Sequence, residues 1–261
     1  MPRPFNEAQL TERSCTWSPP TNFEERLKGL LVPPSLYIRY KAQKEWWRGE
    51  PEFRLLPLLV DRRRNAIDVG ANKGTYTYAL ARLTKLVWAF EPNPKMFKIL
   101  ERGVPANVTA AMVALSNRSG QAELRVPRMR KGGFSNQGGS LSATKISANY
   151  RAVAVETRRL DDLDLEDIGF MKIDVEGFEA EVLEGARETI RRERPVMIIE
   201  IEERYTKVPI EIALQRVLDL GYVGMFLVHG TLRPLEQFDP IAHHRVADDS
   251  YVANFLFFPK S

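Results

Sequence analysis

The stretch that decides the fold runs from residue 66 to residue 94 and reads AIDVGANKGTYTYALARLTKLVWAFEPNP. A short apolar run ends at Asp68, a glycine-containing turn and a helical segment follow, and a second apolar run ends at Glu91. Strand, helix and strand signals in this order predict a parallel sheet covered by helices on both faces. In such sheets, ligands bind outside the carboxyl ends of the strands, where both acids fall. We therefore expect a ligand site at this edge.

The alternation continues to the end of the chain and predicts a doubly wound α/β fold. We expect strands at about 66–69, 86–90, 108–112, 168–173, 196–201, 222–228 and 252–258, and helices at about 75–84, 94–102, 177–192 and 208–220. The segments AELRVP and RAVAVETRRL predict extra strands, and the long Gly-, Ser- and Lys/Arg-rich loop between them, 128–147, is typical of a functional lid. Prolines divide residues 1–60 into short helical pieces, which predicts an N-terminal extension before a main domain at 61–261.

Composition is that of a soluble globular protein. Of 261 residues, 44% are hydrophobic and 28% charged, with no apolar run long enough to span a bilayer. The single cysteine, Cys15, leaves no partner for an internal disulfide or a cysteine zinc cluster, and the amino terminus lacks the pattern of a secretory signal. We therefore expect a cytoplasmic protein. The net charge of +4 is spread among nearly as many acids, so we expect no nucleic-acid partner.

The segment LYIRYKAQKEWWRG, 36–49, sets Tyr37, Ile38, Tyr40, Trp46 and Trp47 among lysines and arginines. Two readings are open: an interfacial helix that makes peripheral contact with a membrane, or a helix whose aromatic side chains dock it on the core. We favour docking, with the basic residues outward, because charges interrupt the apolar face.

The acid at the end of the second strand suggests the ligand. Glu91 stands where an acid accepts both hydroxyl hydrogens of an adenosine ribose. Gly70 and Gly74 let the backbone approach closely, and the helix after them offers N–H groups to an anionic group. A dinucleotide site usually has three glycines, but Asn72 occupies one of those places, and Asp68 favours a nearby ammonium group over a pyrophosphate.

S-adenosylmethionine meets all of these demands because it carries a ribose, an ammonium group and a carboxylate. At the end of the third strand, the adenine would lie on the backbone of Ala114 and Leu115, with Ser116 able to hydrogen-bond its edge. The complete predicted cofactor site comprises Asp68, Gly70, Asn72, Gly74, Thr75, Tyr76, Glu91, Asn93, Ala114, Leu115, Ser116 and Asp174.

Four blocks, DVGANKGTYT, AFEPNP, MVALSN and FMKIDVEGFEAEVLEGA followed by PVMIIEIE, resemble the FkbM-type S-adenosylmethionine-dependent methyltransferases. The resemblance covers about residues 50–260. It implies a seven-stranded Rossmann-like sheet in the order 3-2-1-4-5-7-6, with the last strand antiparallel. It also implies methyl transfer to a hydroxyl oxygen, commonly on a sugar, a glycan or a polyketide.

Because aliphatic hydroxyls are very weak acids, such a transfer benefits from a base. Asp174 and Glu176 follow the fourth main strand and are the first candidates, and His229, after the sixth strand, is another. Glu200 and Glu202 could join Asp174 around a magnesium ion, although nothing in the spacing demands a metal and we do not expect one.

Other function classes remain open from the sequence. A nicotinamide-dependent oxidoreductase or epimerase shares the sheet but should carry the three-glycine loop, and a non-catalytic binding domain would not need all the acids. Methyltransferases of nucleic-acid amines usually have Asn or Asp before Pro-Pro and an aromatic residue, where this chain reads IDVEG. A protein or another small molecule as acceptor, and the oligomeric state, are also left open.

Overall fold

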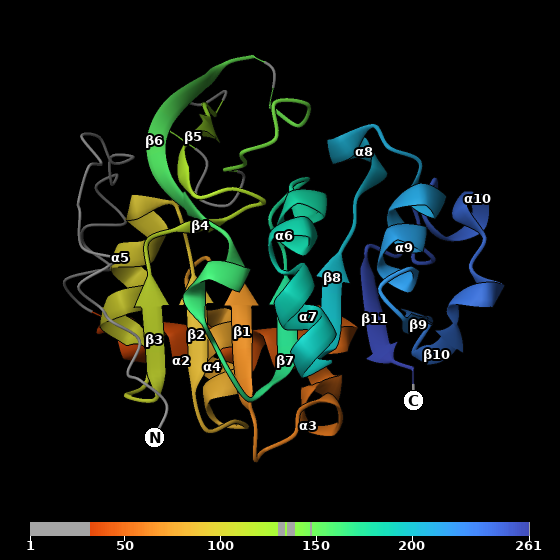
Figure 1. Ribbon diagram of the computed structural model, residues 1–261, viewed down its shortest axis with the longest axis horizontal. Helices are drawn as coiled ribbons and strands as arrows, with labels where there is room; N and C mark the ends of the chain where they lie inside the picture. Colours follow the sequence, from red (N-terminus) through yellow and green to blue (C-terminus); the bar gives the residue numbers. More distant parts are fainter. Residues whose placement is uncertain (1–31, 130–133, 135–138, 147, 261) are drawn as a thin grey trace.

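The computed structural model describes residues 32–129, 134, 139–146 and 148–260 (Figure 1). The helix expected around NFEERLKGLL, Cys15 and much of the loop at 128–147 lie outside the described residues.

A mostly parallel eight-stranded sheet forms the centre of the molecule. Its strand order is β10-β9-β11-β8-β7-β1-β2-β3. β11 runs antiparallel to both of its neighbours, while β3, β2, β1, β7 and β8 are parallel. The strands are β1 (Asn65–Val69), β2 (Val87–Phe90), β3 (Val108–Ala111), β7 (Ile168–Ile173), β8 (Val196–Glu200), β9 (Tyr222–Val228), β10 (Thr231–Pro234) and β11 (Asn254–Pro259). The expected doubly wound order with an antiparallel last strand is confirmed.

The expected number of seven strands is corrected by β10, which adds an eighth strand at the edge. Val228 of β9 pairs directly with Thr231 of β10, so His229 and Gly230 form a two-residue hairpin turn. Both have positive φ, 49° and 73°, as the tight turns that match strand twist require. The sequence did not predict this hairpin because histidine at the first turn position is a weaker signal than Asn or Asp.

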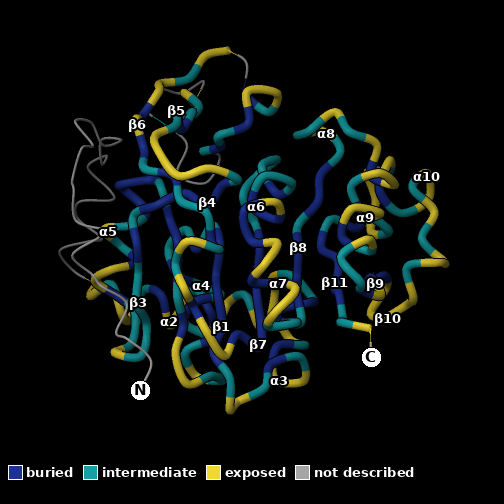
Figure 2. The backbone as a smooth tube through the Cα atoms, viewed as in Figure 1, coloured by how far each residue is buried: buried dark blue, intermediate teal, exposed yellow. Residues whose placement is uncertain are grey.

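Helices cover both faces of the sheet (Figure 1). Side chains alternate along β1: Ala66 packs in one apolar cluster with residues of α2 and α4, while Ile67 and Val69 pack in another with residues of α6, α7 and α9. The helices are α2 (Pro34–Arg48), α3 (Leu56–Leu59), α4 (Thr75–Ala81), α5 (Pro94–Gly103), α6 (Glu179–Gly185), α7 (Arg187–Glu193), α8 (Glu203–Thr206), α9 (Ile210–Leu218) and α10 (Pro240–His243), with short 3-10 turns at η2 (Pro51–Leu55), η3 (Leu160–Leu163) and η4 (Leu235–Gln237). The central strands β1 and β7 are buried along their whole length (Figure 2).

The helix expected at 177–192 is divided in two. α6 ends at Gly185 and α7 begins at Arg187. A Cβ on Gly185 would lie 1.9 Å from the carbonyl oxygen of Ser116, so only glycine lets this part of the helix approach the chain after β4 (Ala114–Leu115).

A separate three-stranded sheet, in the order β4-β6-β5, lies beyond the carboxyl ends of β1 and β2 (Figure 1). β5 (Gly120–Pro127) and β6 (Tyr150–Arg158) form a long antiparallel pair, which confirms the two extra strands. Ala114 and Leu115 belong to this sheet because they pair with Thr157 and Arg158 of β6. The third main strand ends at Ala111, close to the expected bound, so Ala114 and Leu115 lie beyond it and not at its end.

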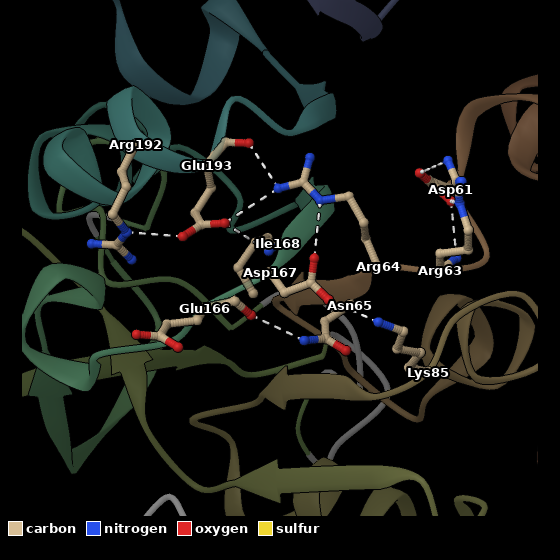
Figure 3. Close-up of polar contacts among 10 residues, drawn as sticks. All are labelled: Asp61, Arg63, Arg64, Asn65, Lys85, Glu166, Asp167, Ile168, Arg192 and Glu193. Atoms are coloured by element: carbon tan, nitrogen blue, oxygen red, sulfur yellow. Dashed lines mark hydrogen bonds and ion pairs between the residues drawn. The ribbon is translucent and has the colours of Figure 1, made fainter. Parts of the chain in front are cut away.

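Ion pairs fasten the opposite edge of the main sheet, where β1 and β7 begin (Figure 3). The Arg64 guanidinium contacts Asp167 at 3.4 Å and Glu193 at 3.2 Å, and Lys85 contacts Asp167 at 3.0 Å. Arg63 pairs locally with Asp61. Two arginines of the basic run at 62–64 therefore serve structural contacts far from the ligand edge.

The packing of α2 contradicts the expectation that its aromatic residues dock it on the core. Ile38 and Ala42 are buried, at 1% and 6% exposure, whereas Tyr40, Trp46 and Trp47 are exposed. Ile38 fills a gap beside two glycines, because a Cβ on Gly74 or Gly103 would meet its Cδ1 at 3.5 or 2.4 Å. Small apolar contacts dock this helix; Tyr37 is half-buried, with Lys73 Nζ 5.9 Å from its ring centroid, while the other three aromatic residues point away.

Candidate active site

A cavity of about 300 Å³ opens at the carboxyl edge of the sheet, where the strand order reverses between β1 and β7. This is the place where open α/β sheets bind ligands. Eight predicted residues line it: Gly70, Asn72, Glu91, Asn93, Ala114, Leu115, Asp174 and Glu176. A second cavity of about 140 Å³ lies beside α2 and is lined by three more, Asp68, Thr75 and Tyr76. The cavities share Glu50, Gly70, Asn72 and Asp174, so they adjoin.

Glu91 occupies one end of the larger cavity and is 6% exposed. Its two carboxylate oxygens accept backbone hydrogen bonds from Asn72 and Asn93, each at 2.7 Å. Asn72 has φ +51°, a conformation that asparagine tolerates better than most residues. Burial raises the pKa of Glu91 to about 7, although the two N–H donors oppose the shift. The carboxyl group is thus held rigidly in place, with oxygen lone pairs left to receive hydroxyl hydrogens.

Asp68 is buried at the end of β1 and is held by a single side-chain donor. The Thr77 hydroxyl donates to its Oδ2 at 2.5 Å, and burial raises its pKa to about 6. The residue therefore presents a fixed acid to the smaller cavity, as the prediction of a nearby ammonium group requires.

The two glycines of the loop do different things. Gly70 has φ +82°, and a Cβ there would lie 1.8 Å from the Asp174 carbonyl oxygen, so glycine is what lets the end of β1 approach the end of β7. Gly74 has φ +91°, and a Cβ there would lie only 2.7 Å from Leu100 Cδ1, so the absence of a side chain makes room for Leu100. Gly74 lines neither cavity and acts in turn formation and packing.

Two carboxyl groups and a buried amine meet at the junction of the cavities. The side chain of Glu200, at the end of β8, is hydrogen-bonded to Asp174, and burial together with the Asp174 charge raises the pKa of Glu200 far above its ordinary value. Burial and the neighbouring charge therefore favour the protonated form of Glu200.

Lys172 lies beneath this pair and is 1% exposed. Its Nζ is 3.8 Å from Asp174 Oδ2, donates to Asn254 Oδ1 at 3.1 Å and faces the Tyr76 ring at 5.1 Å. Burial lowers the pKa of Lys172, but the Asp174 and Glu50 carboxylates outweigh burial and raise it. The Lys172 amine therefore carries a positive charge beside the Asp174 carboxyl group.

Glu176 fastens the segment that covers the larger cavity. Its carboxylate is paired with Lys145, and its backbone carbonyl accepts a hydrogen bond from the Ser140 hydroxyl at 2.7 Å. Burial raises the pKa of Glu176, with Lys145 opposing the shift. Residues 139–141 line the cavity, so this contact holds part of the predicted lid closed.

Besides Gly74, two predicted site residues are not brought to either cavity. Ser116 is buried at 3% exposure, and its hydroxyl contacts Asn117 Oδ1 at 3.4 Å. His229 lies in the β9–β10 turn, with its Nε2 3.2 Å from the Ser250 hydroxyl. Since β11 and β8 separate β9 from β7, His229 is remote from Asp174 in the sheet.

Sequence reasoning assigned no site role to Glu50 or Lys172, and it considered Glu200 only as a metal ligand. Glu50 follows α2, lines both cavities, and accepts a hydrogen bond from the Tyr76 hydroxyl at 2.6 Å. The signal for Lys172 was a lysine next to the end of an otherwise apolar strand. Glu202, the other candidate metal ligand, instead contacts Arg204 at 2.6 Å and Tyr251. Among the described residues, no group of three or more His, Cys, Asp or Glu is arranged to hold a metal ion.

The model of the FkbM methyltransferase domain matches residues 68–223, which include the end of β1, all of β2, β7 and β8, and the cavity residues that follow them. The chain belongs to the FkbM methyltransferase family. The matched domain is thus a methyltransferase domain, as the sequence resemblance implied.

Solved structures show similarity at the level of the chain trace. The chain is similar to the FkbM methyltransferase of Methylobacillus flagellatus KT, with 17% identity, a TM-score of 0.49, and coverage of 86% of this chain and 55% of that one. It is also similar to an rRNA methylase from Streptococcus thermophilus, with 14% identity, a TM-score of 0.43 and coverage of 81% and 98%. A third similar structure is a putative methyltransferase from Streptococcus mutans in complex with SAH, with 12% identity, a TM-score of 0.42, and coverage of 78% of this chain and 93% of that one. The chain spans just over half the length of the FkbM structure, and no curated protein matches it.

Among the described residues, no helix is both long enough and apolar enough to cross a membrane.

Proposed function

We propose that this FkbM-family protein transfers a methyl group from S-adenosylmethionine to a hydroxyl oxygen of a carbohydrate-like acceptor. The observation that carries the proposal is the distribution of acids around one cavity: Glu91 is fixed there by two backbone N–H groups, and the hydrogen-bonded pair of Asp174 and Glu200 lines the same cavity.

The residues present fit the donor. Glu91 is positioned to receive the two ribose hydroxyls, and Ala114 and Leu115 supply an apolar wall for the adenine. Asp68 and Asp174 offer negative charge on the side where an ammonium group would lie. When bound, S-adenosylmethionine supplies an electrophilic methyl group, so the protein has to position an acceptor oxygen and remove its proton.

Asp174 is the proposed base. It lies at the junction of the two cavities, it is 32% exposed at its side chain, and the Lys172 amine lies 3.8 Å from its Oδ2. Glu200, whose pKa is raised by burial, orients Asp174 through their hydrogen bond. Glu176 is the weaker candidate because Lys145 already occupies its carboxylate.

A hydroxyl-rich acceptor suits this site because its open wall consists of hydrogen-bond acceptors. Glu50, Asp174, Glu176 and Glu200 all line the larger cavity. Lys145 occupies the Glu176 carboxylate and burial favours the protonated form of Glu200, which leaves Glu50 and Asp174 as the acceptors. Carboxylates accept hydrogen bonds from hydroxyl groups, whereas the phosphates of a nucleic acid would be repelled. We also propose that the protein works in a reducing, cytoplasmic setting. Residues 1–60 would form an extension of the main domain.

Transfer of a radiolabelled methyl group tests the acceptor class. The protein is incubated with labelled S-adenosylmethionine and, in separate reactions, with an oligosaccharide mixture, total RNA and a protein extract. We expect label in the saccharide fraction, as an ether that is stable to mild base, and its loss with Asp174→Asn. Label recovered in RNA or protein alone would overturn the proposed acceptor class, while leaving the methyl donor in place.

A further inference from the structure

The outer face of α2 carries a stripe of large apolar side chains that no described part of the chain covers. Leu36, Tyr40 and Trp47 are 55%, 61% and 71% exposed. At about 100° per residue, these three positions fall within about 40° of one another around the helix. Trp46, 38% exposed, extends the stripe on one side.

The opposite face of the same helix is already packed against the protein. Ile38 and Ala42 are buried against the protein, with Ile38 seated beside Gly74 and Gly103. α2 therefore has two apolar faces, and packing on the protein accounts for only one of them. Exposed aromatic groups collected on one surface mark a site of interaction.

The charges around the stripe have one sign. Arg39, Lys44 and Arg48 are exposed beside it. Glu45 is the one acid in α2, and its carboxylate is turned back to accept a hydrogen bond from the backbone N–H of Glu50 at 2.7 Å. The outer face therefore combines tyrosine, tryptophan and leucine with cations.

The charge of the stripe decides between partners. A large side chain has on the order of 200 Å² of surface, so these four expose roughly 450 Å² together. A protein interface of about 800 Å² per partner contains apolar area of the same order, so area alone does not choose a partner. The cations beside the stripe do, because the aromatic side chains of an interfacial helix insert at the headgroup level while its cations meet anionic lipid headgroups.

We infer that α2 docks this protein on an anionic lipid bilayer through the face of Leu36, Tyr40 and Trp47. Lys41 and Glu45 of the same helix line the smaller cavity. Docking would therefore place that cavity close to the membrane surface. This inference concerns binding and is independent of the methyl acceptor.

Sedimentation with vesicles tests the inference. The full chain is mixed with vesicles of neutral phosphatidylcholine and with vesicles that also contain phosphatidylglycerol. We expect binding to the anionic vesicles, a fall in binding as salt rises, and at least a tenfold loss of partitioning for Tyr40→Ser/Trp47→Ser. The matched control is Leu58→Ser, because Leu58 is 84% exposed on α3, outside the stripe; it should bind like the wild type.

Two results would overturn the inference. One is wild-type protein that stays in the supernatant with both kinds of vesicle. The other is a dimer, measured by light scattering, that dissociates in the double variant, since the stripe would then be an interface between two copies of the chain. Unchanged binding of S-adenosylhomocysteine by the double variant confirms that it is folded.

Discussion

The ionisation of one carboxyl group, that of Glu91, should decide how well the larger cavity binds a ribose. Its two oxygens are fixed by the backbone N–H groups of Asn72 and Asn93, and burial raises its pKa to about 7. Ribose hydroxyls donate to the ionised form, so ligand binding and ionisation of Glu91 favour each other.

This coupling predicts a pH dependence of nucleoside affinity. A pKa of about 7 makes roughly a tenth of Glu91 ionised at pH 6 and nine tenths at pH 8. The affinity for 5′-methylthioadenosine, which carries the ribose but no amino acid, should therefore rise about tenfold between these values and level off above. Calorimetric titration measures it, with Glu91→Gln as a variant that should bind weakly and without a pH slope. A flat wild-type profile contradicts the role given to Glu91.

Substitution of Asp174 and substitution of Glu200 should lower kcat to different extents. Asp174→Asn removes the proposed base and should lower kcat by about 10²–10⁴, with donor affinity nearly unchanged. Glu200→Gln keeps a hydrogen-bond donor toward Asp174 and should lower kcat by less than about tenfold. Steady-state kinetics with matched donor titrations separate them. An active Asp174→Asn enzyme, or an equal loss in both variants, would remove Asp174 from its assigned role.

At the scale of elements, contacts between distant segments hold the described part of the lid, and the pair of Lys145 and Glu176 is the charged one. Lys145 and Glu176 pair at side-chain exposures of 12% and 24%, so solvent screens them only in part. The sequence predicted a lid but could not predict what fastens it, because the two residues are 31 positions apart.

Loss of this contact should loosen residues 139–146. We expect Lys145→Gln to exchange amide hydrogens faster in this segment and to bind S-adenosylhomocysteine roughly fivefold more weakly, which corresponds to about 1 kcal/mol. Exchange followed by mass spectrometry measures the first effect. Lys98→Gln, on an exposed position of α5, is the control. Equal exchange in the two variants would show that the pair does not hold the lid.

Short sequence patterns predicted the elements whose structure depends on residues near one another in the chain. Hydrophobic runs and their terminal acids located β1, β2, Asp68 and Glu91 correctly, since strand ends at this edge lie close together whatever the rest of the chain does. His229 was misplaced because positive φ at residues 229 and 230 makes a hairpin. Glu50 was missed because its contact with Tyr76 depends on how α2 packs.

For the whole molecule, buried acids link stability to pH. Glu52, 4% exposed at the start of η2, has its pKa raised by burial to about 7, against 4.5 for an ordinary glutamate. A raised carboxyl pKa contributes stability that is complete below about pH 4.5 and is lost as the pH rises through 7. Glu91 and Glu179 show the same direction of shift.

The unliganded protein should therefore lose stability between pH 5 and pH 8, and Glu52→Gln should reduce that loss. The variant should match the wild type near pH 5 and be more stable by roughly 1–3 kcal/mol at pH 8. Urea unfolding at the two pH values measures this, and Glu101→Gln, at an exposed position, is the control. A pH-independent effect of Glu52→Gln would contradict the assignment.

The identity of the donor is the central claim, and calorimetric titration of the wild type with S-adenosylmethionine and with NAD tests it most directly. We predict micromolar binding of S-adenosylmethionine, no measurable binding of NAD, and loss of the former in Glu91→Ala but not in Glu101→Ala. Tighter binding of NAD, or undiminished binding of S-adenosylmethionine by Glu91→Ala, would contradict the account.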